Sequence, residues 1–345
     1  MKNNLSARAA TATAVAFLAL IAALPVPAQG FPDRAVHLVV ANPAGGAGDI
    51  IAKAIVDRLA KALGQPVTVE YRAGASGAMG ARSVARATPD GYTLLVGQTT
   101  EIVINRTLAK ELGYNPDSDL VPVAFLAAMP LALIVPATAP YSTVGQLVQA
   151  SRSSPRGLSF ASTGPGTPGH LAAELLKTKT DSRLTHVPYD GGGAALDAVL
   201  NNQVDFHFQA LPTAMPQVAA KKLKILAVSS ARRSPAVPDV PTVAEATGIK
   251  DFDVILWAGI FAPRSTPTAI VARLNQEINN ILEQPDVKDS LARSGAEVNP
   301  MSVGEFAGFV RFETSKYETL IRNEFCSKLL YGGCGGFGAA VMLLP

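Results

Sequence analysis

Three strands expected in this sequence lead directly into glycine-rich turns, and each turn opens a helix. The first turn, Pro43–Asp49, follows a β-branched run that ends at Val40 and precedes an amphipathic helix over 50–63. The other two turns are Ser162–His170 and Tyr189–Gly193. Such a turn leaves backbone N–H groups unpaired near the positive end of a helix dipole, so it can hold an anion without a charged side chain.

Strands and helices alternate along the chain at the spacing of parallel βαβ units, which predicts an α/β fold. Strands are expected over 31–40, 66–70, 92–97, 158–161, 185–189, 204–209, 225–229 and 254–261, and helices over 50–63, 102–112, 142–151, 194–200, 268–283, 285–293 and 303–322, with two more that end near 87 and 177. Leu120–Val135 is expected to hold two short strands on either side of Pro130. In open α/β sheets, ligands bind where turns follow the carboxyl ends of strands. Because the three turns lie in different halves of the chain, we expect a cleft between two domains.

Length and charge narrow the class of protein. The chain of 345 residues is 48% hydrophobic, which is enough for two domains because a single core stops growing at roughly 250–300 residues. Its formal net charge is +3, and Lys2 and Arg8 supply two of these charges. The remaining chain is close to neutral and has no Lys/Arg cluster, which argues against a nucleic acid as partner.

The N-terminus has the pattern of a signal peptide. Lys2 and Arg8 precede an apolar run over 9–24, and small residues around Ala28 predict cleavage after that residue. An uncleaved membrane anchor is the alternative, but prolines end the apolar run before it reaches the ~20 residues that a span needs. We therefore expect a chain that is exported from the cytoplasm.

The second turn contains a formal dinucleotide-binding pattern. Gly164-Pro-Gly-Thr-Pro-Gly169 matches G-x-G-x-x-G between a strand and a helix. Its two prolines remove N–H groups that a pyrophosphate would use. An anion-holding loop is favoured over a nucleotide site, and a purely structural turn is the other alternative.

Two side chains in these turns have alternative roles. Asp49 stands just inside a helix start, where it either caps the helix and stiffens the loop or contacts a ligand directly. His170 either hydrogen-bonds a ligand or its own loop, or it packs. His37, His186 and His207 lie within strand patterns and are interpreted as structural, and the histidines are too scattered to predict a metal site.

The sequence does not predict catalysis. Ser76 lies in Gly-Ala-Ser-Gly, which lacks the G-x-S-x-G spacing of a hydrolase nucleophile. Two aromatic residues have open interpretations. Tyr189 either contacts an apolar ligand or belongs to the core, and Trp257, the only tryptophan, is either a cleft-wall or hinge residue or a core residue, the second being favoured.

Eight short motifs resemble the Bug-type solute-binding receptors of tripartite tricarboxylate transporters. They are Phe-Pro-Asp-Arg at 31–34, Ala-Gly-Gly-Ala-Gly-Asp at 44–49, Val-Glu-Tyr-Arg-Ala-Gly-Ala-Ser-Gly at 69–77, Thr-Pro-Asp-Gly-Tyr-Thr-Leu-Leu at 88–95, Phe-Ala-Ser-Thr-Gly-Pro-Gly-Thr-Pro-Gly-His at 160–170, Val-Pro-Tyr-Asp-Gly-Gly-Gly at 187–193, Pro-Asp-Val-Pro-Thr-Val-Ala-Glu-Ala at 238–246 and Trp-Ala-Gly-Ile-Phe-Ala-Pro at 257–263. They occur in family order and span nearly the whole chain after the N-terminal segment. Each alone is weak, and together they are specific.

The resemblance implies an α/β, two-lobed periplasmic binding protein of the "Venus flytrap" kind, type II-like, in which the chain crosses twice between the lobes. Lobe 1 would comprise 29–130 and 252–323, and lobe 2 would comprise 131–251. The implied function is that of a monomeric, non-enzymatic receptor without cofactor or metal. It captures a small carboxylate (a di- or tricarboxylate, an amino acid or an aromatic acid) in the periplasm and delivers it to two membrane subunits. A carboxylate sensor that docks to a membrane signalling protein is the alternative.

In this family, backbone N–H groups and ordered waters from a loop on each lobe hold the ligand carboxylate. The matching loops here are the three glycine-rich turns, and Thr99 and Gln209 match further positions that line the cleft. The ligand-binding residues so implied are Ala44, Gly45, Gly46, Asp49, Thr99, Ser162, Thr163, Gly166, Thr167, His170, Tyr189, Gly191 and Gln209.

The chain departs from the family pattern at several positions. Asp190, Lys221 and Thr247 stand where the resemblance leads us to expect other residues. An acid at 190 beside a carboxylate pocket would repel a second anionic group, which favours a neutral or amino-bearing distal group on the ligand. The end of the chain, 324–345, matches nothing in the family, and its Cys326 and Cys334 are expected to form at most a local disulfide.

Overall fold

The computed structural model describes residues 30–109 and 111–322. The expected signal peptide and the atypical C-terminal tail with Cys326 and Cys334 lie outside the described residues. From Pro32 to Arg322 the described chain belongs to one compact unit. None of the described helices combines the length and the apolar character needed to cross a membrane.

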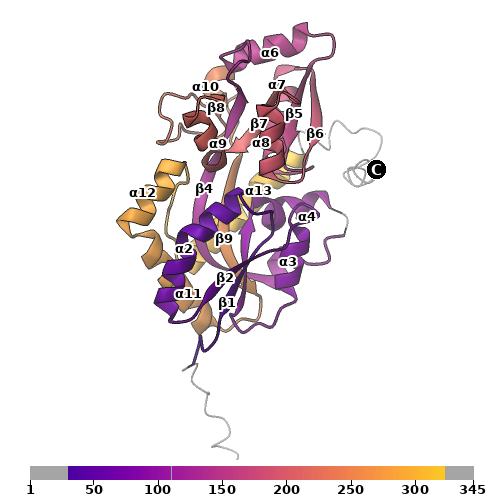
Figure 1. Cartoon of the computed structure of the whole chain (residues 1–345). Coiled ribbons are helices and arrows are strands. Elements are labelled where there is room, and N and C mark those ends of the chain that lie inside the picture. Colours follow the sequence, from indigo (N-terminus) through magenta and orange to yellow (C-terminus); the bar gives the residue numbers. More distant parts are fainter. Residues whose placement is uncertain (1–29, 110, 323–345) are drawn as a thin grey trace, which may run out of the picture. The chain divides into compact units, whose positions relative to one another are not determined.

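A mixed sheet carries the fold, and its strand order is β2-β1-β3-β9-β4-β7-β5-β6, with β8 paired to β4 (Figure 1). The strands are β1 (Val36–Val40), β2 (Val67–Tyr71), β3 (Thr93–Gln98), β4 (Leu120–Pro136), β5 (Leu158–Ser162), β6 (Leu184–Pro188), β7 (Phe206–Ala210), β8 (Leu223–Val228) and β9 (Ile255–Pro263). β1 pairs in parallel with β2 and β3, and β5 pairs in parallel with β6 and β7. The expected βαβ units are therefore present in both halves of the chain, and β4 and β9 are antiparallel strands between them.

Strand β4 is one continuous element, so the expectation of two short strands was wrong. Up to Pro130 it pairs with β9, and from Leu131 it pairs with β7 and β8. Pro130 thus stands where the pairing passes from one partner to the next, a position at which a residue without an N–H group is tolerated.

The exchange of partners along β4 divides the sheet between two lobes. We call lobe 1 the part built on β1, β2, β3, β9 and the first part of β4, and lobe 2 the part built on β5 to β8 and the end of β4. The chain crosses between them in β4 and again between β8 and β9, where Val254 donates a 3.0 Å hydrogen bond to the carbonyl of Ser229. This two-lobed, twice-crossed arrangement is the expected fold class. The lobe limits stated above stay a prediction, and the strand pairing is compatible with them.

Helices flank both parts of the sheet (Figure 1). They are α2 (Ala47–Leu63), α3 (Ala78–Ala85), the π-helical turn η1 (Thr100–Ile104), α4 (Asn105–Leu108), α5 (Pro116–Asp119), α6 (Val144–Ser153), α7 (Pro168–Thr180), α8 (Gly192–Leu200), α9 (Leu211–Ala219), α10 (Val243–Thr247), α11 (Thr268–Leu282), α12 (Pro285–Ser294) and α13 (Val303–Ile321). Helix α9, which contains Pro212 and Pro216, was not expected. Pro212 lies in the first turn, where no intrahelical N–H bond is lost, whereas Pro216 lies inside the helix and removes one such bond.

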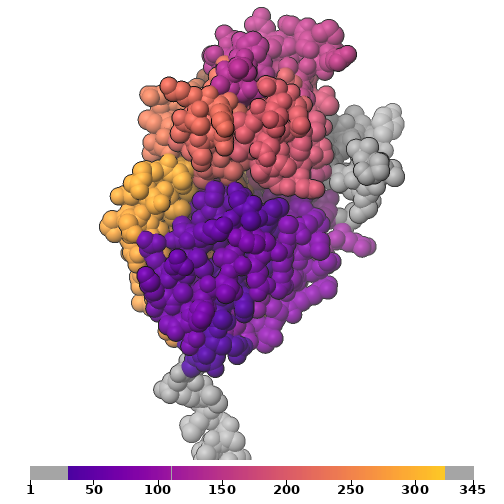
Figure 2. Space-filling view, viewed as in Figure 1, coloured from indigo at the N-terminus to yellow at the C-terminus, as the bar shows by residue number. Residues whose placement is uncertain are grey.

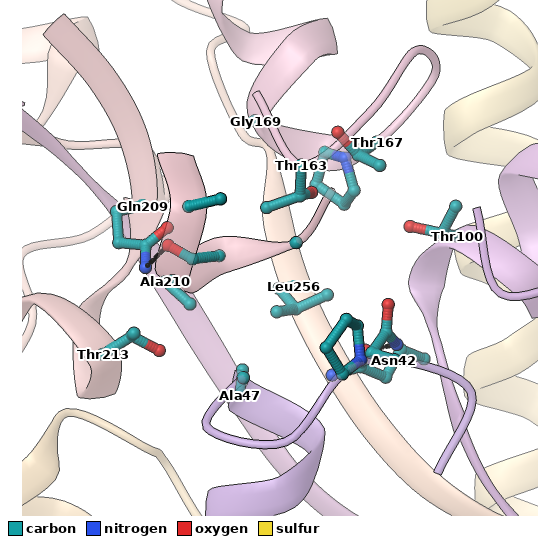
Figure 3. A pocket seen from close by; sticks show the side chains of 18 of the residues that line it. Asn42, Ala47, Thr100, Thr163, Thr167, Gly169, Gln209, Ala210, Thr213 and Leu256 are labelled. Atoms are coloured by element: carbon teal, nitrogen blue, oxygen red, sulfur yellow. Dashed lines mark hydrogen bonds between the residues drawn. The ribbon is translucent and has the colours of Figure 1, made fainter. Parts of the chain in front are cut away.

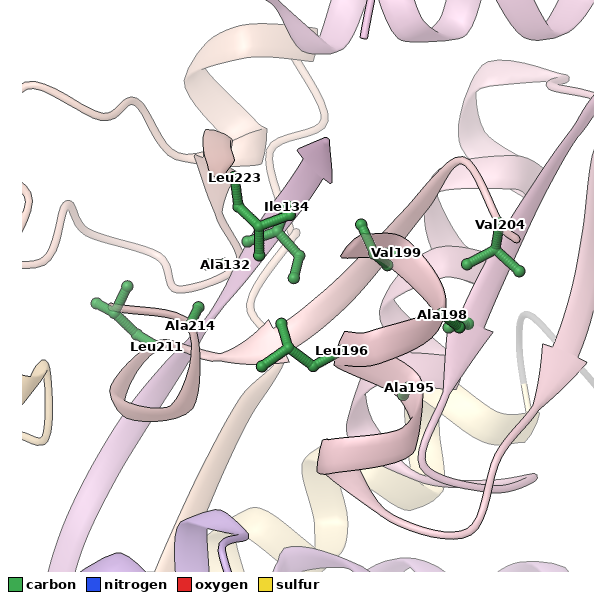
Figure 4. Packing of buried hydrophobic residues seen from close by; sticks show 11 residues of the cluster. Ala132, Ile134, Ala195, Leu196, Ala198, Val199, Val204, Leu211, Ala214 and Leu223 are labelled. Carbon is green, nitrogen blue, oxygen red and sulfur yellow. The ribbon is translucent and has the colours of Figure 1, made fainter. Parts of the chain in front are cut away.

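Each lobe has its own hydrophobic core. In lobe 2, Ile134 of β4, Val199 of α8 and Leu211 of α9 belong to one buried cluster (Figure 4). In lobe 1, Trp257 is fully buried, packs edge-on against Phe306 and donates a 3.1 Å hydrogen bond from Nε1 to the Glu313 carboxylate. These contacts agree with the core interpretation of Trp257.

Candidate functional site

A cavity of about 250 Å³ lies between the two lobes. Figure 3 shows Asn42 and Thr100 of lobe 1 around the same space as Thr163, Thr167, Gln209 and Thr213 of lobe 2. On the face of the molecule seen in Figure 2, lobe 1 in indigo meets lobe 2 in orange and pink along a continuous seam. On this face the two lobes are in contact.

Four helices begin at this cavity. The residues that precede the first turns of α2, α7, α8 and α9 are Gly46, Thr167, Gly191 and Ala210, and all four line the cavity. None of these helix starts is closed by a side-chain hydrogen bond. The starts of α6, α10 and α13, away from the cavity, are closed by hydroxyl side chains, although those of α11 and α12 are also open. First-turn N–H groups are therefore available at the cavity, together with four positive dipole ends.

The side chains that line the cavity are almost all neutral. Asp190 is the only charged residue among the described lining residues, and no lysine or arginine is present there. The polar neutral ones are Asn42, Ser76, Gln98, Thr100, Thr163, Thr167, Gln209 and Thr213. Any attraction for an anion must come from backbone and amide dipoles rather than from a positive side chain.

Asp49 holds the first turn in place through hydrogen bonds made by its buried side chain. Its carboxylate, only 2% exposed, accepts hydrogen bonds from the Gly45 N–H at 2.7 Å, from Lys53 at 2.9 Å and from the Tyr71 hydroxyl at 2.7 Å. Burial alone would raise the pKa of Asp49, but the hydrogen bonds from Lys53, Gly45 and Tyr71 outweigh it and lower the pKa. The capping position belongs to Gly46, and Asp49 is the third helical residue. It does not line the cavity, so the structure places it where it stiffens the loop.

The second turn is held by its own polar side chains. The Ser162 hydroxyl donates to the Gly164 carbonyl at 3.0 Å, as does that of Thr167 at 2.7 Å. The Gly166 N–H donates to Nδ1 of His170 at 3.0 Å. Thr163 and Thr167 line the cavity, whereas Ser162, Gly166 and His170 lie outside its lining.

Three histidines support lobe 2 beneath this turn. The His170 and His186 rings stack with centroids 4.0 Å apart, and His207 Nδ1 lies 2.8 Å from the Ala161 carbonyl. Burial lowers the pKa of His170 to about 3 and the pKa values of His186 and His207 to about 4, so all three are neutral at pH 7. In the part of the chain that the structure describes, no group of His, Cys, Asp or Glu residues is arranged to hold a metal ion.

The third turn brings lobe 2 against lobe 1. A Cβ atom on Gly191, whose φ is +95°, would lie 3.1 Å from Cγ of Pro43. Gly191, Gly192 and Gly193 line the cavity, while Tyr189 packs against the hydrophobic cluster of lobe 2. The core alternative for Tyr189 is therefore the one that its packing supports.

The end of β3 supplies lining residues that the sequence prediction missed. Gln98 and Thr100 line the cavity, and the Gln98 amide oxygen accepts a 2.5 Å hydrogen bond from Asn42. The Gln98 side-chain NH₂ group is buried without a hydrogen-bond partner. The predicted residue, Thr99, is fully buried and accepts a 2.9 Å hydrogen bond from the Trp257 N–H.

The predicted site residues thus divide into two groups. Those that line the cavity are Ala44, Gly46, Thr163, Thr167, Gly191 and Gln209, and those that do not are Gly45, Asp49, Thr99, Ser162, Gly166, His170 and Tyr189. Seven further lining residues lie within the three predicted turns: Pro43, Ala47, Pro168, Gly169, Asp190, Gly192 and Gly193. Lining residues outside the predicted set are Asn42, Ser76, Gln98, Thr100, Leu131, Ala194, Phe208, Ala210, Thr213 and Leu256. Contact with a ligand stays a prediction for all of them.

Comparison with known proteins places the chain in a family. The model of the family described as "Tripartite tricarboxylate transporter family receptor" matches residues 51–325. The protein BugT of Bordetella pertussis is 31% identical over 87% of this chain and 92% of its own length.

Solved structures agree with this placement. A Rhodopseudomonas palustris protein solved with adipate has a TM-score of 0.82 at 34% identity, covering 85% of this chain and 97% of that one. MatC from Rhodopseudomonas palustris, solved with bound malate, has a TM-score of 0.79 at 36% identity, covering 84% of this chain and all of that one. The chain has the periplasmic binding protein fold, and it belongs to the Bug-type receptor family of the tripartite tricarboxylate transporters.

Proposed function

We propose that the protein binds a small carboxylate in the cavity between its lobes. The observation that carries this proposal is the meeting of four open helix starts, those of α2, α7, α8 and α9, in one cavity whose described lining has no basic side chain. Backbone N–H groups at helix starts suit a carboxylate, which accepts several hydrogen bonds at once. The buried, unpartnered NH₂ group of Gln98 adds a further donor at the cavity wall.

The size of the cavity and the ligands of two relatives support a small organic acid. A volume of about 250 Å³ corresponds to roughly eight water molecules at ~30 Å³ each. The similar proteins from Rhodopseudomonas palustris were solved with adipate and malate, which are both small carboxylates. By this proposal Ala44, Gly46, Thr163, Thr167, Gly191 and Gln209 contact the ligand, and Gly45, Asp49, Ser162 and His170 hold the loops in place.

The proposed role is transport rather than catalysis. The ligand contacts both lobes and thereby favours the closed state over an open one. The receptor, outside the cytoplasm after removal of 1–28, then delivers its ligand to two membrane subunits. Family membership supports this partner, and loss of uptake of the identified acid in cells that lack the receptor is the expected consequence.

A thermal-shift screen over small carboxylates tests the binding step. We expect one acid or a related group of acids to raise the melting temperature. Gly46→Val should abolish that rise, because the valine side chain would extend from the cavity wall into the space that the ligand occupies. The backbone of Gly46 (φ −77°, ψ 173°) accommodates valine, so the variant should fold. Gly304→Val, on the far helix α13 in open space, is the matched control and should keep the response. No rise with any acid would refute the proposal.

A further inference from the structure

We propose that two side chains of lobe 2, those of Gln209 and Asp190, recognise a cationic hydrogen-bond donor, so that the ligand is an amino carboxylate rather than a dicarboxylate. This inference rests on the proposed carboxylate-binding function and concerns the far end of the ligand. The observations that carry it are the side-chain amide of Gln209, its contact with His207, and the acid at Asp190.

The first observation is the protonation pattern of His207. Its Nδ1 lies 2.8 Å from the Ala161 carbonyl oxygen, which can only accept a hydrogen bond, so Nδ1 carries the proton. His207 is buried and neutral at pH 7, because burial lowers its pKa to about 4. Its Nε2 is therefore an acceptor that needs a donor.

The second observation is the partner of that nitrogen. His207 Nε2 lies 2.7 Å from the side-chain amide of Gln209 at the position drawn as Oε1, while the NH₂ group lies 3.3 Å from the Gly192 carbonyl oxygen. Two acceptors at 2.7 Å repel each other, and the two ends of an amide are assigned from such contacts. We conclude that the Gln209 amide is rotated, so that its NH₂ group donates to His207 and its oxygen takes the position nearer Gly192.

This rotation replaces a donor with an acceptor at the cavity wall. Gln209 is 2% exposed and lines the cavity, and its oxygen would stand beside the Gly192 carbonyl oxygen about where its NH₂ group is drawn. Neither oxygen can donate to the other. The Gln209 oxygen is then left without a donor, which a ligand group that carries N–H bonds supplies and a second carboxylate on the ligand does not.

Asp190 adds a negative charge to the same side. It directly precedes the glycines of the third turn, lines the cavity and is exposed, so it stands where the cavity meets solvent. Its carboxylate is the only charged group among the described lining residues. It attracts an ammonium group and repels a distal carboxylate, and water moderates both effects because Asp190 is exposed.

The test compares matched ligand pairs by titration calorimetry. Each pair consists of a dicarboxylate (butanedioate, pentanedioate or hexanedioate) and the ω-amino acid with the same number of chain atoms, and α-amino acids of similar size are added. We expect the tightest amino carboxylate to bind at least tenfold more tightly than the matched dicarboxylate. Asp190→Asn should reduce this preference about tenfold. Asp197→Asn, which removes the same charge from the exposed side of α8 outside the cavity, should leave it unchanged.

Three results would overturn the inference. Tighter binding of dicarboxylates than of amino carboxylates would refute the inference while leaving the proposed function in place. An unchanged preference in Asp190→Asn would refute the role of the Asp190 charge. A ¹⁵N NMR spectrum in which the His207 ring carries protons on both nitrogens at pH 7 would refute the rotated amide. Absence of binding by either class would instead refute the proposed function itself.

Discussion

Gly166 of lobe 2 lies so close to Leu108 of lobe 1 that a Cβ atom on Gly166 would stand 2.6 Å from Cδ1 of Leu108. Nearby, the Ser76 hydroxyl donates a 3.4 Å hydrogen bond to the Pro165 carbonyl oxygen across the same boundary. Gly166 does not line the cavity, but it stands where the lobes must meet for the cavity to close. Its role is therefore predicted to concern closure rather than ligand contact.

Gly166→Ala is expected to weaken ligand binding about tenfold. The methyl group collides with Leu108 in the closed state, and the φ of +75° adds a backbone cost of roughly 1–2 kcal/mol for any L-residue with a side chain. Titration calorimetry with a bound acid measures the effect. Gly248→Ala is the matched control, because its φ is +76° but nothing lies within 4 Å of the added atom. It should lower the melting temperature without changing affinity, and Leu108→Ala should restore part of the affinity to Gly166→Ala. Equal affinities in Gly166→Ala and Gly248→Ala would contradict the closure role.

Asp49→Asn is expected to lower the free energy of unfolding by about 1–3 kcal/mol, because it weakens charge-assisted hydrogen bonds in a buried site. Since the folded-state pKa of Asp49 is below its ordinary value of 3.8, this stabilisation is present above pH 3.8 and is lost as pH falls through the lower folded value. Urea unfolding at pH 7 measures the loss. Asp57→Asn, on the exposed side of the same helix, should be close to neutral. A similar loss in both variants would contradict the specific role of Asp49.

Local sequence signals were sufficient to place the turns but not to orient their side chains. Glycines between a strand and a helix identify a turn from the sequence alone, and all three predicted turns contribute residues to the cavity. Whether Asp49 or His170 faces a ligand depends on what fills the space beneath the loop. Both bond backbone N–H groups of their own loops, of Gly45 and of Gly166, instead.

The sequence prediction left out lining residues at the end of β3 and at the start of α9, for two different reasons. Strand β3 ends at Gln98, and Thr99 already has the helical dihedrals (φ −46°, ψ −41°) of the turn that follows, which the sequence pattern did not reveal. Thr99 faces Trp257, whereas Gln98 lines the cavity. Ala210 and Thr213 were missed because no helix was expected at 211–219, and both residues lie at the start of that helix.

The three histidines of lobe 2 are expected to make the protein acid-sensitive. Their folded-state pKa values lie below the unfolded value of 6.5, so the unfolded chain binds protons that the folded chain excludes. Stability is therefore full above pH 6.5 and falls as pH decreases from 6.5 toward 4, by up to about 1.4 kcal/mol per histidine and pH unit. His170→Asn, whose side-chain oxygen can replace Nδ1 as acceptor for Gly166, should reduce the slope of melting temperature against pH. An unchanged slope in His170→Asn would contradict this contribution.

Glu101 is expected to have the opposite effect on the pH dependence of stability: it makes the protein less stable as the pH rises. Its carboxyl group lies in η1 beside the cavity residues Gln98 and Thr100, is fully buried, and accepts a 2.8 Å hydrogen bond from the Gln98 N–H through one oxygen only. Burial raises its pKa to about 8, so the folded protein holds a proton that the unfolded chain releases near pH 4.5. The contribution of Glu101 to stability is therefore full below pH 4.5 and is lost as pH rises to 8.

The Glu101→Gln variant isolates this effect, because it keeps the shape of the side chain and cannot ionise. The fall in melting temperature between pH 7.5 and pH 8.5 should be smaller in Glu101→Gln than in the unmodified protein, since above about pH 7.5 the buried histidines are almost entirely neutral in both the folded and the unfolded chain. Glu111→Gln, which removes an exposed carboxylate, should reproduce the unmodified profile. If Glu101→Gln and Glu111→Gln gave the same profile, Glu101 would have to be ionised in the folded protein at neutral pH, and its proximity to Gln98 would then place a second negative charge behind the wall of the cavity.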